Sequence, residues 1–382
     1  MRILFFNYEY PPLGGGAANA TAYILGEFAK ISDLEVDLVT SSVDENYHLD
    51  RISENVRVHR LPIGKNSSNL HFQSQKDLII YSWRAYWFSK KLIKKNKYNL
   101  THSFFSVPCG FLSMLLKFEY GLPYIISLRG SDVPGYSNRF GLIYYILKPV
   151  IKFIWAKSTA VISNSDGLRD LALKAKPEQE IGIIYNGVDI VDFRPDLAKK
   201  SVDKFIITLG ASRVTKRKGI DYLIRSIKLL LPRYPNIILK VLGDGDEKDS
   251  LIALAKELEL ENQVQFVGRI PKEKTLPYYQ EANLFVLPSF NEGMSNAMLE
   301  ALASGLPIVA TRTGGTDELV VEGRNGFVVE MGNSADLAEK MEKIISNREL
   351  CEKMGAESVS LAEGMSWQKV AEKYFELYKT IK

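Results

Sequence analysis

Cysteine is scarce in this 382-residue chain, and long uninterrupted apolar runs are absent from it. Its two cysteines, Cys109 and Cys351, form no Cys-x-x-Cys pair and could not staple a protein of this length, which favours a reducing compartment. The apolar run at residues 3–6 stops at Asn7 and is too short for the apolar region of a signal peptide. From these absences we expect the protein to be cytoplasmic.

Acidic residues are missing from residues 78–118, a stretch that contains seven Lys and Arg residues among several aromatic ones. The first half of the chain is the more basic: residues 1–190 hold 22 Lys and Arg against 17 Asp and Glu, and the rest hold 27 against 28. The stretch is interpreted either as a solvated helix face or as a contact with an anionic membrane surface. Because the whole chain is nearly neutral, with a formal charge of +4, and has no nucleic-acid motif, we expect no nucleic-acid partner.

Residues 139–157 form a second basic and apolar stretch, which is too short and too interrupted for a membrane span of about 20 apolar residues. Lys148 and Lys152 lie four residues apart and hence on one helical face. Such a helix either packs into a core with its lysines reaching water, or lies on a bilayer. Any membrane contact is therefore expected to be peripheral, on the inner face of the membrane, through residues 78–118 and 139–157.

The order of apolar runs and helical patterns predicts an α/β fold with parallel sheets. At 46% hydrophobic and 25% charged residues the composition is that of a globular protein, and the length suggests two domains. The pattern of strand, loop and helix restarts near residue 203, so we expect two Rossmann-like, doubly wound domains with a boundary within residues 186–204. Strands are expected at residues 3–6, 36–40, 56–61, 100–105, 124–128, 160–163 and 181–184, and then at 205–209, 237–242, 264–267, 284–287, 308–310 and 327–329.

Two carboxylates, Glu292 and Glu300, bracket a predicted crossing from strand to helix at residues 291–307. Gly293 follows the first of them and lets backbone N–H groups approach a ligand closely, while Glu300 lies about one turn inside the helix. An anionic ligand bound at the N-terminus of this helix would have one acid on each side.

A basic loop follows the first strand of the second half, at residues 211–219. It lies where ligands bind in open α/β sheets, and an Arg combined with a Lys would suit a diphosphate. We expect Arg213 and Lys218 to face inward and Lys216 and Arg217 to face solvent; the alternative is a merely solvated loop.

Glycines 14–16 follow the first strand and open a helix, the place where phosphates bind in this architecture. They match neither a dinucleotide fingerprint nor a P-loop, and tight turning alone would also explain them. No metal is expected, because Asp244-Gly245-Asp246 is interpreted as a turn and the four histidines show no ligand spacing.

Short motifs from one end of the chain to the other recur in a characteristic order. They are Pro11-Pro12-x-Gly-Gly-Gly16, Asn186-Gly187-Val188-Asp189 with Phe193-x-Pro195, Arg213 with Lys218-Gly219, Gly243-Asp244-Gly245, Phe266-Val267-Gly268, Leu287-Pro288-Ser289, the pair Glu292 and Glu300, Gly305-Leu306-Pro307, Gly314-Gly315 and Asn325-Gly326-Phe327. In this order and spacing the chain resembles the retaining glycosyltransferases of family 4, the group 1 glycosyl transferases.

The resemblance implies the GT-B fold, in which two Rossmann-like domains face each other across a cleft that binds a nucleotide sugar. It places an acceptor-side domain at residues 1–190, joined by the C-terminal helix 367–382, and a donor-binding domain at residues 191–366. The residue pattern alone would have allowed that helix to pack on either domain.

The resemblance also assigns roles to residues, with no cofactor beyond the donor itself. Catalytic roles fall to Arg213, Lys218, Glu292 and Arg129. The diphosphate would be bound by Arg213 and Lys218, the ribose by Glu300, and the sugar by Glu292 with the backbone of the residues that follow it. The full set expected to contact the donor is Gly15, Gly16, Arg213, Lys218, Arg269, Ile270, Glu292, Gly293, Met294, Ser295, Asn296 and Glu300.

Two residues depart from the family pattern. Arg129, in Arg129-Gly130-Ser131-Asp132, stands where many members have a His beside the reacting sugar, and could pair with a sugar carboxylate or with Asp132. Ser295 stands where Pro or Gly is common, which bears on donor preference.

The function expected from the resemblance is transfer of a sugar, with retention, from a UDP- or GDP-type donor to a saccharide or lipid-linked acceptor. Bacterial surface-polysaccharide or glycolipid assembly is the expected setting. The rival hypotheses are a nucleotide-sugar epimerase and a non-catalytic nucleotide-sugar-binding protein.

Overall fold

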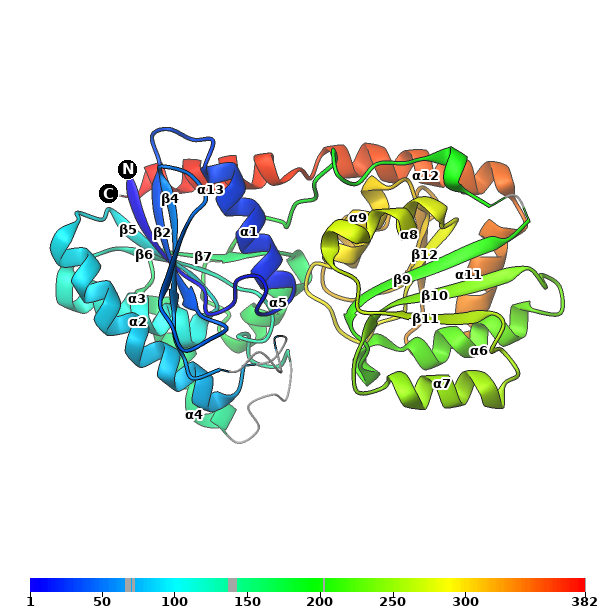
Figure 1. Ribbon diagram of the computed structural model, residues 1–382, viewed down its shortest axis with the longest axis horizontal. Coiled ribbons are helices and arrows are strands. Elements are labelled where there is room, and N and C mark those ends of the chain that lie inside the picture. Colours follow the sequence, from blue (N-terminus) through cyan, green and yellow to red (C-terminus); the bar gives the residue numbers. More distant parts are fainter. Residues whose placement is uncertain (66–69, 71–72, 137–142, 202, 382) are drawn as a thin grey trace. The chain divides into compact units, whose positions relative to one another are not determined.

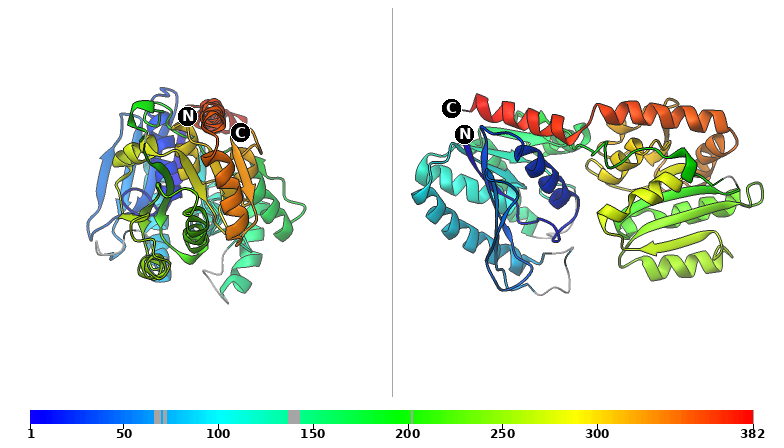
Figure 2. Two further views of the ribbon diagram at one scale, coloured as in Figure 1. Left: turned by 90° about the vertical axis from the view of Figure 1, so that its right-hand side faces the viewer. Right: turned by 45° about the horizontal axis from the view of Figure 1, so that its top comes forward.

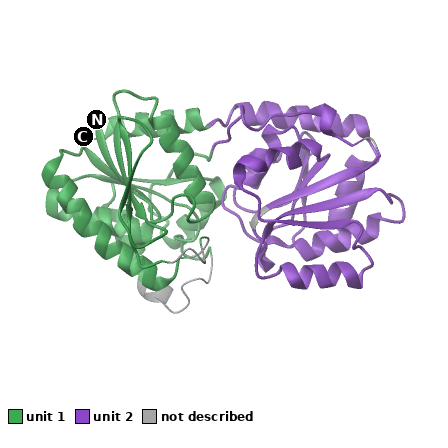
Figure 3. Ribbon diagram, in the orientation of Figure 1, with its two compact units in different colours: residues 1–186, 367–382 green, residues 187–366 purple. Residues whose placement is uncertain are grey.

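The chain divides into two α/β units, each built around its own sheet (Figures 1 and 3). Unit 1 comprises Met1–Asn186 and Trp367–Lys382, and unit 2 comprises Gly187–Ser366. The structure is a computed structural model, and it describes residues 1–65, 70, 73–136, 143–201 and 203–381. The part of residues 139–157 that precedes residue 143 therefore lies outside the described residues.

The sheet of unit 1 has the strand order β3-β4-β2-β1-β5-β6-β7-β8. All neighbouring strands are parallel except β3, which pairs with β4 in the antiparallel direction. The order reverses between β1 and β5, which is the switch point where ligands bind in open sheets. The strands are β1 (Arg2–Phe6), β2 (Glu35–Ser41), β3 (His48–Arg51), β4 (Val56–Leu61), β5 (Leu100–Phe104), β6 (Tyr124–Ser127), β7 (Ala160–Ser163) and β8 (Gly182–Ile183).

Local signals in the sequence set the ends of the helices of unit 1. Ser74 and Asp77 form a capping box that starts α2, and Gly121 in the left-handed conformation ends α3. The helices are α1 (Gly16–Phe28), α2 (Gln75–Lys95), α3 (Phe111–Tyr120), α4 (Ile143–Lys157), α5 (Asp166–Ala175) and α13 (Trp367–Thr380), with a short helical turn at Ser106–Gly110.

Helix α13 completes the core of unit 1 although it follows unit 2 in the sequence, and it lies beside α1 (Figure 2). Trp367 stacks on Tyr23, with ring centroids 5.3 Å apart and ring planes 4° from parallel. Tyr374 and Tyr378 are buried in the same hydrophobic core as strand β1. The helix therefore buries an aromatic face of its own against the first unit.

The sheet of unit 2 is parallel throughout, in the order β11-β10-β9-β12-β13-β14. Its strands are β9 (Phe205–Arg213), β10 (Ile237–Asp244), β11 (Val264–Gly268), β12 (Leu284–Leu287), β13 (Ile308–Thr311) and β14 (Gly326–Val329). Its helices are α6 (Ile220–Leu230), α7 (Lys248–Glu257), α8 (Leu276–Glu281), α9 (Asn296–Ala303), α10 (Thr316–Leu319), α11 (Ser334–Ile345) and α12 (Arg348–Glu363), with short turns at Leu197–Lys199, Lys216–Lys218 and Lys272–Lys274.

The predicted α/β class with two parallel-sheet units is confirmed, and each expected strand has its counterpart. Strand β3 was not predicted from the sequence. It is an edge strand whose residues are mostly exposed, as those of a surface loop are. No helix in the described ranges has both the length and the apolar character that crossing a membrane requires.

Candidate active site

Two loops of unit 2 approach each other closely at the carboxyl ends of the strands. Gly219 follows β9 with φ +61°, and a Cβ atom at this position would lie 2.2 Å from the carbonyl oxygen of Pro288, which follows β12. Only glycine fits so close to another backbone in this conformation. The contact brings the basic loop after β9 against the loop that holds Glu292.

Lys218 and Glu292 form the first ion pair of this site, with 2.6 Å between Nζ and Oε1. Their side chains are only 10% and 11% exposed. Burial raises the pKa of Glu292, but the charges of Lys218 and Arg217 outweigh it, so the pKa lies below its usual value and the carboxylate is ionised.

The inward position expected for Lys218 is confirmed, since the residue is buried. Lys216 and Arg217 are exposed, as expected. Yet the Arg217 guanidinium also donates to the Asn291 carbonyl at 2.8 Å and lies 3.9 Å from Glu292. Arg213 is the last residue of β9, in register with Asp244 of β10. One basic residue at the end of β9 and three in the loop after it thus lie at the edge of the sheet where ligands bind in this architecture.

Glu300 forms the second ion pair, inside helix α9. Its Oε1 lies 2.9 Å from Lys272 Nζ, and its Oε2 accepts a hydrogen bond from the Tyr279 hydroxyl at 3.0 Å. Burial, followed by the charge of Glu300, raises the pKa of Tyr279, so the phenol keeps its proton and donates. Glu292 and Glu300 therefore each form an ion pair with a lysine.

Helix α9 begins in a tightly packed loop. Ser295 is its N-cap and accepts a hydrogen bond from the Met298 amide at 3.3 Å. Gly315, with φ +81°, packs so closely that a Cβ atom would lie 2.7 Å from the Gly293 carbonyl oxygen. The loop of residues 293–296 is thus shaped by a cap on one side and a glycine on the other.

Lys272 and Tyr279 are residues that the sequence did not single out. Lys272 follows β11 by four residues, in the same connection as Arg269, which is exposed, and Ile270, which is partly buried. Lys272 could have been found from its position shortly after a strand, which is also the position of Lys218 and Glu292. Nothing in the sequence pairs Tyr279 of α8 with a carboxylate of α9.

The glycine loop of unit 1 leaves room at the start of α1. Gly15 precedes the helix, and a Cβ atom built on it would meet no other atom within 4 Å. The helix begins at Gly16 and has no acidic residue in its first turn, which suits an anion at the N-terminus. Gly14 has φ +91° and packs against the Glu9 side chain, so it is required by conformation and by space.

Arg129 lies inside unit 1 and is already engaged there. Its guanidinium donates to Asn186 Oδ1 at 2.7 Å and to the Tyr374 hydroxyl at 3.2 Å, and it lies 3.5 Å from the centre of the Phe104 ring. The pairing with Asp132 that the sequence allowed does not form: that carboxylate accepts the backbone amides of Arg129, Gly130 and Ser106 instead. Burial lowers the pKa of Arg129 and raises that of Asp132.

A neutral hydrogen-bonded network adjoins Arg129. His102 bonds through Nδ1 to the Tyr378 hydroxyl at 2.7 Å and through Nε2 to Ser127 Oγ at 2.8 Å. Ser127 Oγ in turn lies 2.9 Å from the Tyr374 hydroxyl. Burial, and then the charge of Arg129, lowers the pKa of His102 well below its usual value, so the imidazole is uncharged.

Two family models together match most of the chain. One, described as glycosyl transferases group 1, matches residues 190–359, and the other, glycosyltransferase family 4, matches residues 14–192. The chain belongs to the group 1 glycosyltransferases. It is accordingly a transferase enzyme.

Relatives of this glycosyltransferase match at moderate identity. An uncharacterized glycosyltransferase of Methanocaldococcus jannaschii is 27% identical over 370 residues, which cover 97% of this chain and 95% of the relative. A lipopolysaccharide core biosynthesis glycosyltransferase of Rhizobium meliloti is 28% identical over 227 residues, which cover 58% of this chain and 64% of the relative.

Solved structures share the fold of this glycosyltransferase. Sucrose-phosphate synthase from Thermosynechococcus elongatus aligns with a TM-score of 0.85 and 22% identity, over 99% of this chain and 98% of that one. Anabaena HepE in complex with UDP-glucose aligns with a TM-score of 0.77 and 18% identity over 100% of both chains. The fold is therefore GT-B.

Proposed function

We propose that this glycosyltransferase moves a sugar, with retention of anomeric configuration, from a UDP- or GDP-type donor to a saccharide or lipid-linked acceptor. The observation that carries the proposal is the pairing of Glu292 with Lys218 and of Glu300 with Lys272 at the ligand edge of the sheet. Ionised groups held this way offer both donors for a diphosphate and acceptors for hydroxyls. HepE, which has the same fold, binds UDP-glucose.

On binding, the donor would replace the ion-pair partners of these residues with its own groups. Its diphosphate takes Lys218, together with Arg213, and these cations stabilise the charge that grows on the leaving group. Glu292, released from Lys218, then accepts sugar hydroxyls beside the backbone of residues 293–296. Glu300 accepts the ribose hydroxyls, and Arg269 and Ile270 contact the base.

The other groups of the proposal come from unit 1. Gly15 and Gly16 offer the open helix start of α1 to phosphate. Arg129 is assigned a positioning role, because its guanidinium is held by Asn186 and Tyr374.

In the proposed front-face step, the bond from the anomeric carbon to the β-phosphate oxygen breaks and its electron pair leaves with the nucleoside diphosphate. The acceptor oxygen bonds to the same face of that carbon, and its proton passes to the departing phosphate. No enzyme carboxylate forms a bond in this step. No metal is needed in it either, and Asp244 supports a turn instead, since its Oδ1 accepts the Gly245 amide at 2.9 Å.

The donor is identified by a thermal-shift panel of nucleotide sugars, because a ligand at 100 times its Kd adds about 2.7 kcal/mol of stability. With the donor in hand, kcat/KM is measured for Glu300→Ala and Arg213→Ala, with exposed Glu257→Ala and Arg225→Ala as controls. The proposal expects large losses in the first two variants only, and unchanged kinetics there would refute it. Incubation with donor alone, with EDTA present, separates transfer from epimerisation and from metal dependence.

We further propose a cytoplasmic location with peripheral contact at the inner membrane face, in surface-polysaccharide or glycolipid assembly. Phe118 of α3 and Phe153 of α4 support this: they are 59% and 48% exposed, with ring centroids 6.4 Å apart. Lys157 lies beside them, with its Nζ 5.6 Å from the centre of the Phe153 ring, and Lys117 Nζ donates to the Lys157 carbonyl at 2.7 Å. Exposed aromatic rings flanked by cations suit an anionic interface. Flotation with phosphatidylglycerol vesicles should be salt-sensitive and should weaken in Phe118→Ser/Phe153→Ser.

A further inference from the structure

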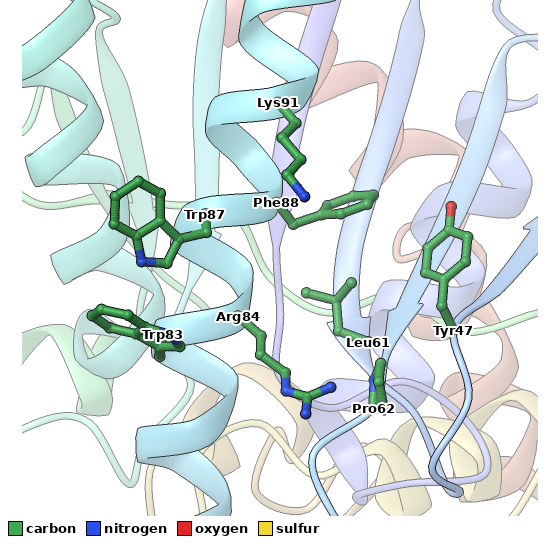
Figure 4. A pocket seen from close by; sticks show the side chains of 8 residues that line it. All are labelled: Tyr47, Leu61, Pro62, Trp83, Arg84, Trp87, Phe88 and Lys91. Atoms are coloured by element: carbon green, nitrogen blue, oxygen red, sulfur yellow. The ribbon is translucent and has the colours of Figure 1, made fainter.

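A pocket of ≈ 390 Å³ lies on unit 1 between α2 and the ends of β3 and β4 (Figure 4). Its size is within the range of small-molecule sites, about 300–1,000 Å³. In the sheet order, β3 and β4 are separated by β2 from β1, whose loop holds the glycines. The pocket is therefore distinct from the switch point. Its walls are Tyr47, Leu61, Pro62, Trp83, Arg84, Trp87, Phe88 and Lys91.

Exposed aromatic rings line this pocket. Trp83 and Trp87 are 67% and 45% exposed, and their rings meet edge to face with centroids 5.7 Å apart. Tyr47, before β3, is 46% exposed, and its hydroxyl is fixed at 2.9 Å from His59 Nδ1. Rings gathered in this way offer apolar faces to a ligand. Flat aromatic faces with polar tips suit the C–H faces of sugar rings, which also need hydrogen bonds.

The charge of the pocket is wholly positive. Arg84 and Lys91 extend from α2 towards the side on which Leu61 and Phe88 lie (Figure 4). No carboxylate lines the pocket, and within the described ranges neither cation takes part in a salt bridge. Lys90, the neighbour of Lys91 on the same helix, is by contrast paired with Glu119. Two cations without a salt bridge beside aromatic rings make the pocket complementary to an anionic ligand.

We propose that this pocket binds an acidic saccharide, with sugar rings against Trp83 and Trp87 and a carboxylate or equivalent anion held by Arg84 and Lys91. A guanidinium binds a carboxylate through two parallel hydrogen bonds, and the lysine adds a point charge. A concave site walled by β4 on one side fits a saccharide better than a flat bilayer. That the occupant is a saccharide rests on the proposed function; the pocket would hold an acidic unit of the acceptor.

Binding to this pocket can be followed by tryptophan fluorescence. The chain has four tryptophans, and the other two, Trp155 and Trp367, are 0% and 3% exposed. Changes in tryptophan fluorescence and in its quenching by acrylamide therefore report on Trp83 and Trp87. The full-length protein is titrated, without nucleotide, with a pentamer of galacturonic acid, with maltopentaose as the neutral counterpart, and with phosphatidylglycerol vesicles.

The expected result is a saturable fluorescence change and protection from acrylamide with the acidic pentamer alone. In Arg84→Gln/Lys91→Gln the affinity should fall at least tenfold, while Lys95→Gln, an exposed cation of the same helix outside the pocket, should bind normally. Circular dichroism shows whether the double variant is folded, and Trp83→Phe, which keeps an aromatic ring, should retain part of the affinity.

Three outcomes would overturn the proposal: equal binding of the neutral pentamer, a response to vesicles alone, or no response to any probe. A response to vesicles alone would make the pocket part of a membrane surface. Because no donor is present, each of these outcomes leaves the sugar-transfer assignment standing. Loss of transfer in Arg213→Ala, conversely, leaves the pocket untouched.

Discussion

Two cations, Lys218, which is buried, and Arg129, which is partly buried, show how differently the two units use charge. Lys218 of unit 2 follows β9 and is paired with the ionised carboxylate of Glu292, whereas Arg129 of unit 1 follows β6 and is held by the neutral groups of Asn186 and Tyr374. A cation paired with a carboxylate can exchange it for an anionic ligand without being left uncompensated. A cation held by neutral oxygens is fixed in place, and its burial lowers its pKa. The first arrangement suits binding and the second suits positioning.

The largest effect should come from removing the exchangeable cation. Lys218→Ala takes one stabilising charge from the leaving group, and we expect kcat to fall by about 10²–10³-fold, as for the loss of a preorganised charge-stabilising donor. Steady-state kinetics with the identified donor measure the change. Lys216→Ala, from the exposed part of the same loop, is the control, and equal kinetics for the two variants would contradict the contrast.

Removing the fixed cation should affect stability more than turnover. Arg129→Met fills the space but loses two hydrogen bonds, so we expect a cost of about 1–3 kcal/mol in the free energy of unfolding, with kcat/KM changed less than tenfold at temperatures where the variant is folded. Chemical denaturation and kinetics measure the two quantities. A loss of activity as large as that of Lys218→Ala, with stability intact, would restore Arg129 to the catalytic group.

The neutral network of unit 1 should make stability depend on pH. The folded pKa of His102 lies well below its unfolded value of about 6.5, so the unfolded chain takes up a proton that the folded chain does not. Stability contributed by the neutral ring is present above about pH 6.5 and is lost as the pH falls, by at most about 1.4 kcal/mol per unit. Denaturation from pH 7.5 to 5 measures the slope. His102→Asn should flatten it.

Two helix caps provide the smallest and closest comparison. Ser74 caps α2 in unit 1, and Ser295 caps α9 beside Glu292 in unit 2. Either Ser→Ala change should cost about 1 kcal/mol of stability. Only Ser295→Ala should also raise KM for the donor, because its loop is assigned to the sugar. A change in KM with Ser74→Ala as well would show that the effect comes from stability alone.

Most of the fold could be predicted from the sequence, because buried parallel strands are short apolar runs. These runs alternate along the chain with helical patterns. Edge strand β3 could not, since its residues are exposed and its pairing depends on β4. Helix α13 showed its aromatic face in the sequence, but the unit that this face covers depends on contacts with Tyr23 and His102, which are distant in the chain.

The candidate site was only partly visible in the sequence. Motifs gave Lys218 in the loop after β9, and Glu292 and Glu300 in the connection after β12. The partners Lys272 and Tyr279 come from other connections and become neighbours only when the sheet forms. Arg129 shows the opposite limit: its place in a motif suggested a ligand, and only its contacts show that neutral groups hold it.

The split of unit 1 between Met1–Asn186 and Trp367–Lys382 imposes an order on synthesis. While the ribosome makes unit 2, the first unit lacks the aromatic side chains of α13 that contact His102 and Tyr23 in the folded protein. At about 5–20 residues per second this interval lasts roughly 10–40 s. Unit 2, a continuous segment, can finish folding in the nascent chain, so the part synthesised first is expected to be the last to reach its native state.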